Sequence, residues 1–118
     1  MLPNEKQILS MLALAKKAGK IITGEDGCVK AIRSGAAKLV LVATDASDNT
    51  KKKFADKTSY YNVPIHSLFD KEMVSAHIGM NNRATLVITD TGFVTKILEL
   101  IEKGRRAKEI CPKSEFMN

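Results

Sequence analysis

Two unbroken aliphatic runs constrain the fold of this chain more than any other feature. Residues 38–43 read Lys-Leu-Val-Leu-Val-Ala, and residues 84–89 read Ala-Thr-Leu-Val-Ile-Thr. Short apolar runs without polar alternation predict strands that are covered on both faces, the first of them in a central position of a sheet. Each run leads into Thr-Asp, a small residue and a helical pattern, so the chain contains two similar strand–turn–helix units.

Helical periodicity occupies the segments around these strands. Apolar residues recur at helical spacing over residues 8–18, 28–36, 54–61, 69–78 and 93–101. Two shorter strands are predicted at residues 21–23 and 63–68, and Pro64 favours a strand start or a sheet edge for the second. Alternating helices and strands predict one α/β domain built as a helix–sheet–helix sandwich.

Charge narrows the classes of partner. The chain has 118 residues, which is enough for one domain with a modest core. Its formal net charge is +6. The excess is uneven, because residues 1–58 hold 11 basic and 6 acidic side chains, whereas residues 59–118 hold 8 and 7. Such an imbalance favours a polyanionic partner, of which nucleic acid is the commonest. The alternative is a solvated basic face that aids solubility.

Cysteine and histidine give no sign of a metal site. Cys28 and Cys111 are too few for a metal framework, and Cys28 falls in an apolar register expected to be core. His66 and His77 have no second ligand at metal-binding spacing. No apolar run approaches the ~18 residues of a membrane span, and the first residues lack a secretory pattern. We therefore expect a cytoplasmic protein.

An enzyme would have to use Asp45 and Asp90. Both follow predicted strands, at the carboxyl ends where open α/β sheets collect ligands, and two carboxylates there would bind Mg²⁺ or share acid–base work. The favoured alternative is helix capping, because Asp directly before a helix is a preferred N-cap. No serine elbow, phosphate-binding glycine loop or metal-binding triplet accompanies the pair.

The segment after the first short strand is the most informative for binding. A helix beginning near Gly24 places Asp26, Lys30 and Arg33 on one face. The amide groups of its first turn suit a phosphate, and glycines at 24 and 27 leave room for close approach. Lysine and arginine would hold phosphates while the carboxylate accepts from a guanine edge. The alternative is a solvated face whose acids stabilise the helix dipole.

A resemblance extends this interpretation to most of the chain. Its residues are Gly24, the runs 30–35 and 37–43, Asp45 and Ser47, together with residues 12–20 and 89–93. Over about residues 5–103 the sequence resembles the L7Ae/L30e ribosomal-protein superfamily, and within it the small bacterial YlxQ type. The resemblance implies a single-domain α-β-α sandwich around a mixed four-stranded sheet, with no catalytic activity, so no cofactor is expected.

The resemblance also implies a kind of RNA. Members bind kink-turns, which are internal loops with tandem sheared G·A pairs and one flipped-out nucleotide. Their Gly-x-Asn-Glu-x-x-Lys motif falls on residues 24–30, with Asp26 in place of Asn and Gly27 in place of Glu, and the loop that packs on the flipped-out nucleotide falls on residues 79–84. The expected RNA-binding residues are Thr23, Gly24, Glu25, Asp26, Gly27, Lys30, Arg33, Met80, Asn82 and Arg83.

A protein–protein adaptor on ribosomal or transcription machinery remains the second alternative. We expect the domain to cover residues 1–104, with its last helix ending at Gly104. The remainder, 105–118, is charged and contains Pro112, which predicts a basic disordered tail. The chain has few aromatic residues with which to build an interface, so a monomer is expected.

Overall fold

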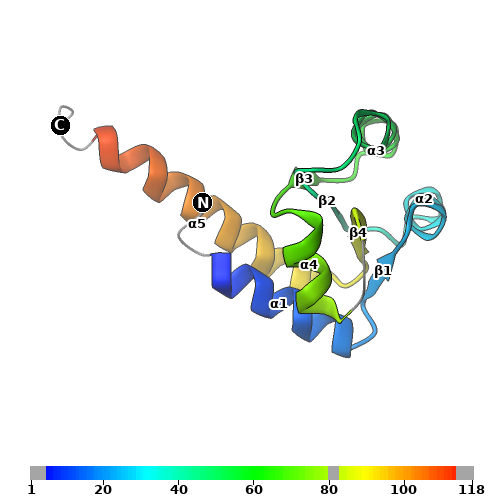
Figure 1. Cartoon of the computed structure of the whole chain (residues 1–118), viewed down its shortest axis with the longest axis horizontal. Helices are drawn as coiled ribbons and strands as arrows, with labels where there is room; N and C mark the ends of the chain where they lie inside the picture. Colours follow the sequence, from blue (N-terminus) through cyan, green and yellow to red (C-terminus); the bar gives the residue numbers. More distant parts are fainter. Residues whose placement is uncertain (1–4, 80–82, 114–118) are drawn as a thin grey trace.

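The computed structural model describes residues 5–79 and 83–113, with side chains up to Lys103, and its elements are arranged in three layers (Figure 1). The helices are α1 (Glu5–Lys17), α2 (Glu25–Ser34), α3 (Asp48–Tyr61), α4 (Lys71–Ile78) and α5 (Thr91–Lys113). The strands are β1 (Ile21–Thr23), β2 (Leu39–Val42), β3 (Ile65–Ser67) and β4 (Thr85–Ile88). All four predicted strands are present, each of the last three slightly shorter than the run that predicted it.

The sheet is mixed and has the order β1-β4-β2-β3. β4 runs antiparallel to β1 and β2, whereas β2 and β3 are parallel. The aliphatic strands β2 and β4 are therefore the two interior strands, and every residue of both is buried. β3 lies at an edge directly after Pro64, as predicted. The central position predicted for β2 is confirmed.

Alternation along the interior strands divides the core into two parts. Leu39 and Leu41 of β2 pack in the cluster that includes α1, α4 and α5. Val40 and Val42 face the opposite way, into the cluster that includes α2 and α3. Figure 1 shows the two helical layers on either side of the sheet. The predicted α-β-α sandwich is confirmed, because each interior strand is covered by helices on both faces.

The core under α2 and α3 combines small residues with one large ring. Phe54 is fully buried there, next to Cys28 and Ala31. Burial raises the pKa of the Cys28 thiol to about 11, so the thiol stays protonated and is a core residue, as predicted. The helical pattern predicted over residues 28–36 extends too far, because α2 ends at Ser34 and Gly35 takes a left-handed conformation. Ala36 lies beyond the helix and is exposed.

The last helix differs from its prediction at its end. α5 continues through Gly104 to Lys113, so the expected stop of the last helix at Gly104 is wrong. The disorder expected of residues 105–118 stays a prediction. Glycine lowers helix propensity by about 1 kcal/mol relative to alanine, which a long helix tolerates. Residues 114–118 lie outside the described part of the chain, and the domain boundary at 104 remains a prediction. None of the described helices is long and apolar enough to span a bilayer.

Candidate nucleic-acid interface

The N-terminus of α2 carries no side-chain cap. Its N-cap residue is Gly24, with φ 89° and ψ 147°, which has no side chain to accept a hydrogen bond from the first turn. A positive φ is a conformation that L side chains rarely adopt, so this junction requires glycine. The first amide groups of a helix have no partner within the helix and lie at the positive end of its dipole. The arrangement leaves donors available to an external anion.

The helices that follow close their own first turns. The Ser47 hydroxyl accepts from the amide of Thr50 at the start of α3, at 3.1 Å. Carboxylates cap the next two helices. Asp70 caps α4, and Asp90 Oδ2 accepts from the amide of Phe93 in the first turn of α5, at 3.0 Å. α2 differs from these three helices, because its N-cap residue provides no side-chain cap.

The two carboxylates of the enzyme alternative do not share a site. Asp90 caps its own helix, as predicted, whereas Asp45 accepts from the amide of Lys71 at 3.0 Å and so helps to start α4 instead of α3. Because β2 and β4 are antiparallel, with Val42 opposite Thr85, the residues that follow them lie at opposite ends of the sheet. Joint acid–base work by this pair is excluded. The described residues contain no cluster of three or more metal-ligating side chains.

Arg83 lies beside the open end of α2. Its Nη1 is 3.7 Å from the position that a Cβ on Gly24 would occupy. The Arg83 amide donates to the Ser75 hydroxyl at 2.8 Å, which fixes the backbone before β4. Its Nε is buried and has no hydrogen-bond partner among the described residues. A guanidinium group and an uncapped helix end therefore meet at one place; that Gly24 and Arg83 bind RNA stays a prediction.

The outer face of α2 agrees with the spacing argument. Asp26, Lys30 and Arg33 are all exposed on this helix, at positions that share one face. Gly27 packs inward, where an added Cβ would lie 3.0 Å from Cγ2 of Ile22. A larger side chain at position 27 would have to displace Ile22, so the glycine serves the packing of α2 against β1.

Glu25 is bound to α3. Its Oε2 accepts from the Thr50 hydroxyl at 2.9 Å, and its Oε1 accepts from Lys53 Nζ at 3.2 Å. The hydrogen bond from Thr50, followed by the bond and charge of Lys53, lowers the pKa of the Glu25 carboxyl. Thr23 pairs with Leu86 across β1 and β4. Met80 and Asn82 lie outside the described residues, so their predicted contacts are untested.

A groove between α2 and α3 was not predicted. It has a volume of about 570 Å³ and is lined by Arg33, Lys53, Asp56, Lys57, Tyr60 and Tyr61, a set that we call the α2–α3 seam. Of its lining residues, only Arg33 was predicted to bind RNA. Lys53, Lys57 and Tyr60 recur at helical spacing, a signal that would have found the α3 side of this groove.

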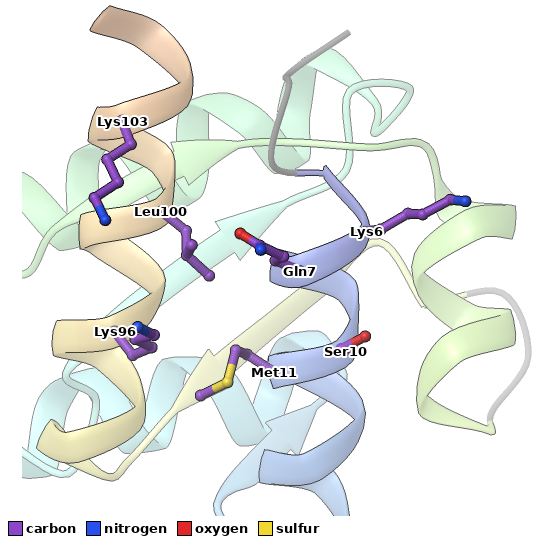
Figure 2. A pocket seen from close by; sticks show the side chains of 7 residues that line it. All are labelled: Lys6, Gln7, Ser10, Met11, Lys96, Leu100 and Lys103. Atoms are coloured by element: carbon purple, nitrogen blue, oxygen red, sulfur yellow. The ribbon is translucent and has the colours of Figure 1, made fainter. Parts of the chain in front are cut away.

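A larger groove lies on the opposite helical layer, between α1 and α5. It has a volume of about 620 Å³, and Figure 2 shows its lining side chains. Lys6 extends away from α5, whereas Lys96 and Lys103 lie along α5 itself (Figure 2). The three ammonium groups do not converge on a common point, so this groove offers no focused anion site.

Known proteins resemble this chain over most of its length. The model of the ribosomal protein L7Ae/L30e/S12e/Gadd45 family matches residues 6–98. The RNA-binding protein YlxQ of Enterococcus faecium is 46% identical over 99 residues, which cover 84% of this chain and 95% of that protein. The RNA-binding protein YlxQ of Bacillus subtilis is 41% identical over 92 residues, covering 78% and 92%.

A solved structure confirms the fold. A protein with unknown function from Bacillus halodurans superposes with a TM-score of 0.79 and 36% sequence identity. The superposition covers 81% of this chain and 97% of that protein.

Proposed function

Because the chain belongs to the ribosomal protein L7Ae/L30e/S12e/Gadd45 family, we propose that it is a non-catalytic RNA-binding protein associated with the ribosome. Two relatives that are 41–46% identical over most of the chain carry RNA binding in their names. The net charge of +6 is consistent with a polyanionic partner. Binding of this kind requires neither a metal nor a cofactor from the protein.

The finer proposal is that the RNA is a kink-turn or a similar sharply bent element. The observation that carries it is the open end of α2, where Gly24 provides no side-chain cap and the Arg83 guanidinium lies alongside. The buried Nε of Arg83 has no hydrogen-bond partner among the described residues. A phosphate placed there would accept from both kinds of donor, as charge-assisted hydrogen bonds. The glycine would let the RNA backbone approach the helix closely.

The remaining predicted residues receive roles from their positions. Lys30 and Arg33 extend the positive field along the exposed face of α2 and would contact further phosphates. Asp26 accepts hydrogen bonds only, which suits the N1–H and N2–H donors of a guanine opened by a sheared pair. Glu25 would act indirectly, because its bonds to α3 hold the first turn in place. The loop residues Met80 and Asn82 are proposed to meet the flipped-out nucleotide.

Recognition of this type couples binding to RNA folding. A protein that binds only the kinked conformer shifts the RNA population toward it, by an amount set by the difference in its affinity for the two conformers. The decisive experiment compares a kink-turn RNA with a matched duplex that lacks the G·A pairs, at two salt concentrations. We expect a preference for the kinked RNA that persists at the higher salt. Equal, salt-sensitive binding to both would refute shape recognition and leave a general RNA-binding surface.

A substitution then locates the site. Lys30→Ala should weaken kink-turn binding and reduce the slope of log affinity against log salt by about one unit. Lys52→Ala is the matched control, because it removes the same charge from an exposed position on α3 that lines neither groove. Equal effects of the two substitutions would show that only total charge matters.

A further inference from the structure

We propose that the α2–α3 seam is a second RNA contact, which holds a single-stranded nucleotide next to the kinked element with its base stacked on Tyr60. The inference rests on the proposed function, since it takes RNA as the partner. It adds a neighbouring site that shares Arg33 with the exposed face of α2 and has its own chemistry and its own test.

The seam is built from one stripe of α3 and the end of α2. Lys53, Lys57 and Tyr60 are four and three residues apart, so they lie on one side of α3. Arg33, in the last turn of α2, lines the same groove. Cations are thus placed along a groove that ends at an aromatic ring, an arrangement that single-strand binding sites use repeatedly.

The aromatic end is exposed to an unusual degree. Tyr60 is 79% exposed and Tyr61 is 39% exposed, and together with Leu14 they are the large hydrophobic side chains that the described structure leaves exposed. The two rings meet edge to face, with centroids 4.8 Å apart and planes at 77°. The contact with Tyr61 leaves most of Tyr60 open to solvent. An exposed ring of this kind provides a platform on which a base can stack.

The charges favour a nucleotide over an acidic protein segment. Arg33 and Lys57 remain available to phosphates, whereas Lys53 is already paired with Glu25. The groove also contains Asp56, a carboxylate that would repel phosphates and acidic side chains alike but can accept from a ribose 2′-hydroxyl, a donor that Asp and Glu side chains lack. A site that mixes two cations, an acceptor and an aromatic face matches the mixed chemistry of a nucleotide.

The seam also lies within reach of the proposed kink-turn site. The rise of α2 from Gly24 to Arg33 is about 13 Å, at about 1.5 Å per residue. The Lys53–Glu25 pair marks the end of the seam nearest the open helix terminus, because Glu25 belongs to the first turn of α2. A strand that leaves the kinked element along α2 therefore arrives at Arg33 and Tyr60.

The test compares RNAs that differ only in a single-stranded extension. One kink-turn RNA ends flush, and two others carry six unpaired adenylates at the 5′ or the 3′ end of the stem. With the unmodified protein we expect one extension to raise affinity on the order of tenfold, as stacking on an aromatic side chain typically does. Tyr60→Leu should remove this gain and leave binding of the flush RNA unchanged, whereas Tyr60→Phe should retain it.

Two further measurements isolate the groove. Lys57→Gln should reduce the gain from the extension more than Lys52→Gln, although both remove one charge from exposed or half-exposed positions on α3. The chain has two tyrosines and no tryptophan, so its intrinsic fluorescence comes from the seam alone. Addition of the extended RNA should lower this emission, because a base stacked on Tyr60 quenches it. The decrease should exceed the inner-filter loss that is measured with the flush RNA.

The outcomes separate this inference from the proposed function. Loss of flush kink-turn binding in Lys30→Ala, with no gain from either extension, would overturn the seam and keep the kink-turn site. Failure to bind flush RNA, combined with Tyr60-dependent quenching by hexaadenylate, would refute the kink-turn and support the seam. A gain from the extension that survives in Tyr60→Leu would overturn the stacking role, and the exposed tyrosines would then be assigned to a protein partner.

Discussion

The first turns of α2 and α5 differ in how their backbone amides find hydrogen-bond acceptors. Both helices follow a strand of the same antiparallel pair, β1 and β4. α5 satisfies its first turn internally, because Asp90 accepts from the amide of Phe93. α2 begins at Gly24 without a side-chain cap and has Arg83 beside it. A closed helix end stabilises the protein by itself, whereas an open one is completed by a ligand.

This difference teaches where to look for a binding surface in a small α/β domain. A side-chain cap contributes about 0.5–2 kcal/mol at a helix start, so a start that lacks one and also has a cation beside the positive end of its dipole is a local loss of stability. Such losses are typical of functional positions, which the rest of the structure has to compensate. The predictions below test whether the two helix ends and their layers behave as differently as their contacts imply.

The largest effect is expected from the core beneath the open helix end. Phe54→Ala should lower the free energy of unfolding by about 3–5 kcal/mol, because the ring is fully buried among residues too small to fill its place. Native-state hydrogen exchange should show amides of α2 and α3 losing more protection than those of α1 and α5. Leu12→Ala, in the opposite core, is the control and should show the reverse pattern. Equal loss in both layers would mean that the two cores act as one.

The next largest effect concerns the open end itself. Gly24→Ala should destabilise the protein by about 1–3 kcal/mol, because alanine at φ 89° is strained. It should also weaken RNA binding, since the helix start would shift or a methyl group would approach Arg83. Chemical denaturation and RNA titration measure the two effects separately. A stable variant with unchanged affinity would remove Gly24 from the interface.

The closed end gives a smaller and purely structural effect. Asp90→Ala should cost about 1 kcal/mol, because the Phe93 amide loses its acceptor. RNA affinity should not change, since this end of the sheet is opposite to the proposed site. If the folded Asp90→Ala variant bound RNA more weakly than the unmodified protein, the start of α5 would belong to the interface, and the two helix ends would not differ in function.

The smallest effect is a pH dependence at the junction of α2 and α3. The pKa of Glu25 is lowered in the folded protein, so its carboxylate contributes stability above its ordinary value of 4.5 and loses it as pH falls through the folded pKa. Glu25→Gln should therefore lower the thermal midpoint slightly at pH 7, and this deficit should vanish in acid. The side chains of the pair are 43% and 45% exposed, so added salt should shrink the difference as well. A deficit that stays constant with pH would show that the charge contributes nothing.

The elements of this fold follow from local patterns, and their junctions do not. Unbroken aliphatic runs predicted β2 and β4 almost to the residue, because residues of interior strands have no solvent-facing side. The stop at Gly104 failed, since glycine ends a helix only where the chain takes a left-handed turn, as it does at Gly35. Nothing within a short window distinguishes those two glycines.

In the candidate site too, features within one element were predictable from the sequence, and contacts between elements were not. The face of α2 with Asp26, Lys30 and Arg33 was predictable from helical spacing within one element. The role of Asp45 was not, because its partner, the amide of Lys71, lies 26 positions away and is brought close only by the parallel pairing of β2 with β3. The α2–α3 seam likewise exists only after α3 has packed beside α2, so the sequence could indicate its α3 stripe but not its meeting with Arg33.

The edge strands of the sheet have a consequence for how this protein associates with others. Its outermost strands, β1 and β3, are three residues each, and the second follows a proline that has no amide hydrogen to donate. Short edge strands of this kind offer few free backbone N–H and C=O groups with which another polypeptide could extend the sheet. The protein is therefore protected against strand-by-strand aggregation at high concentration, and partners must bind it through helices and loops.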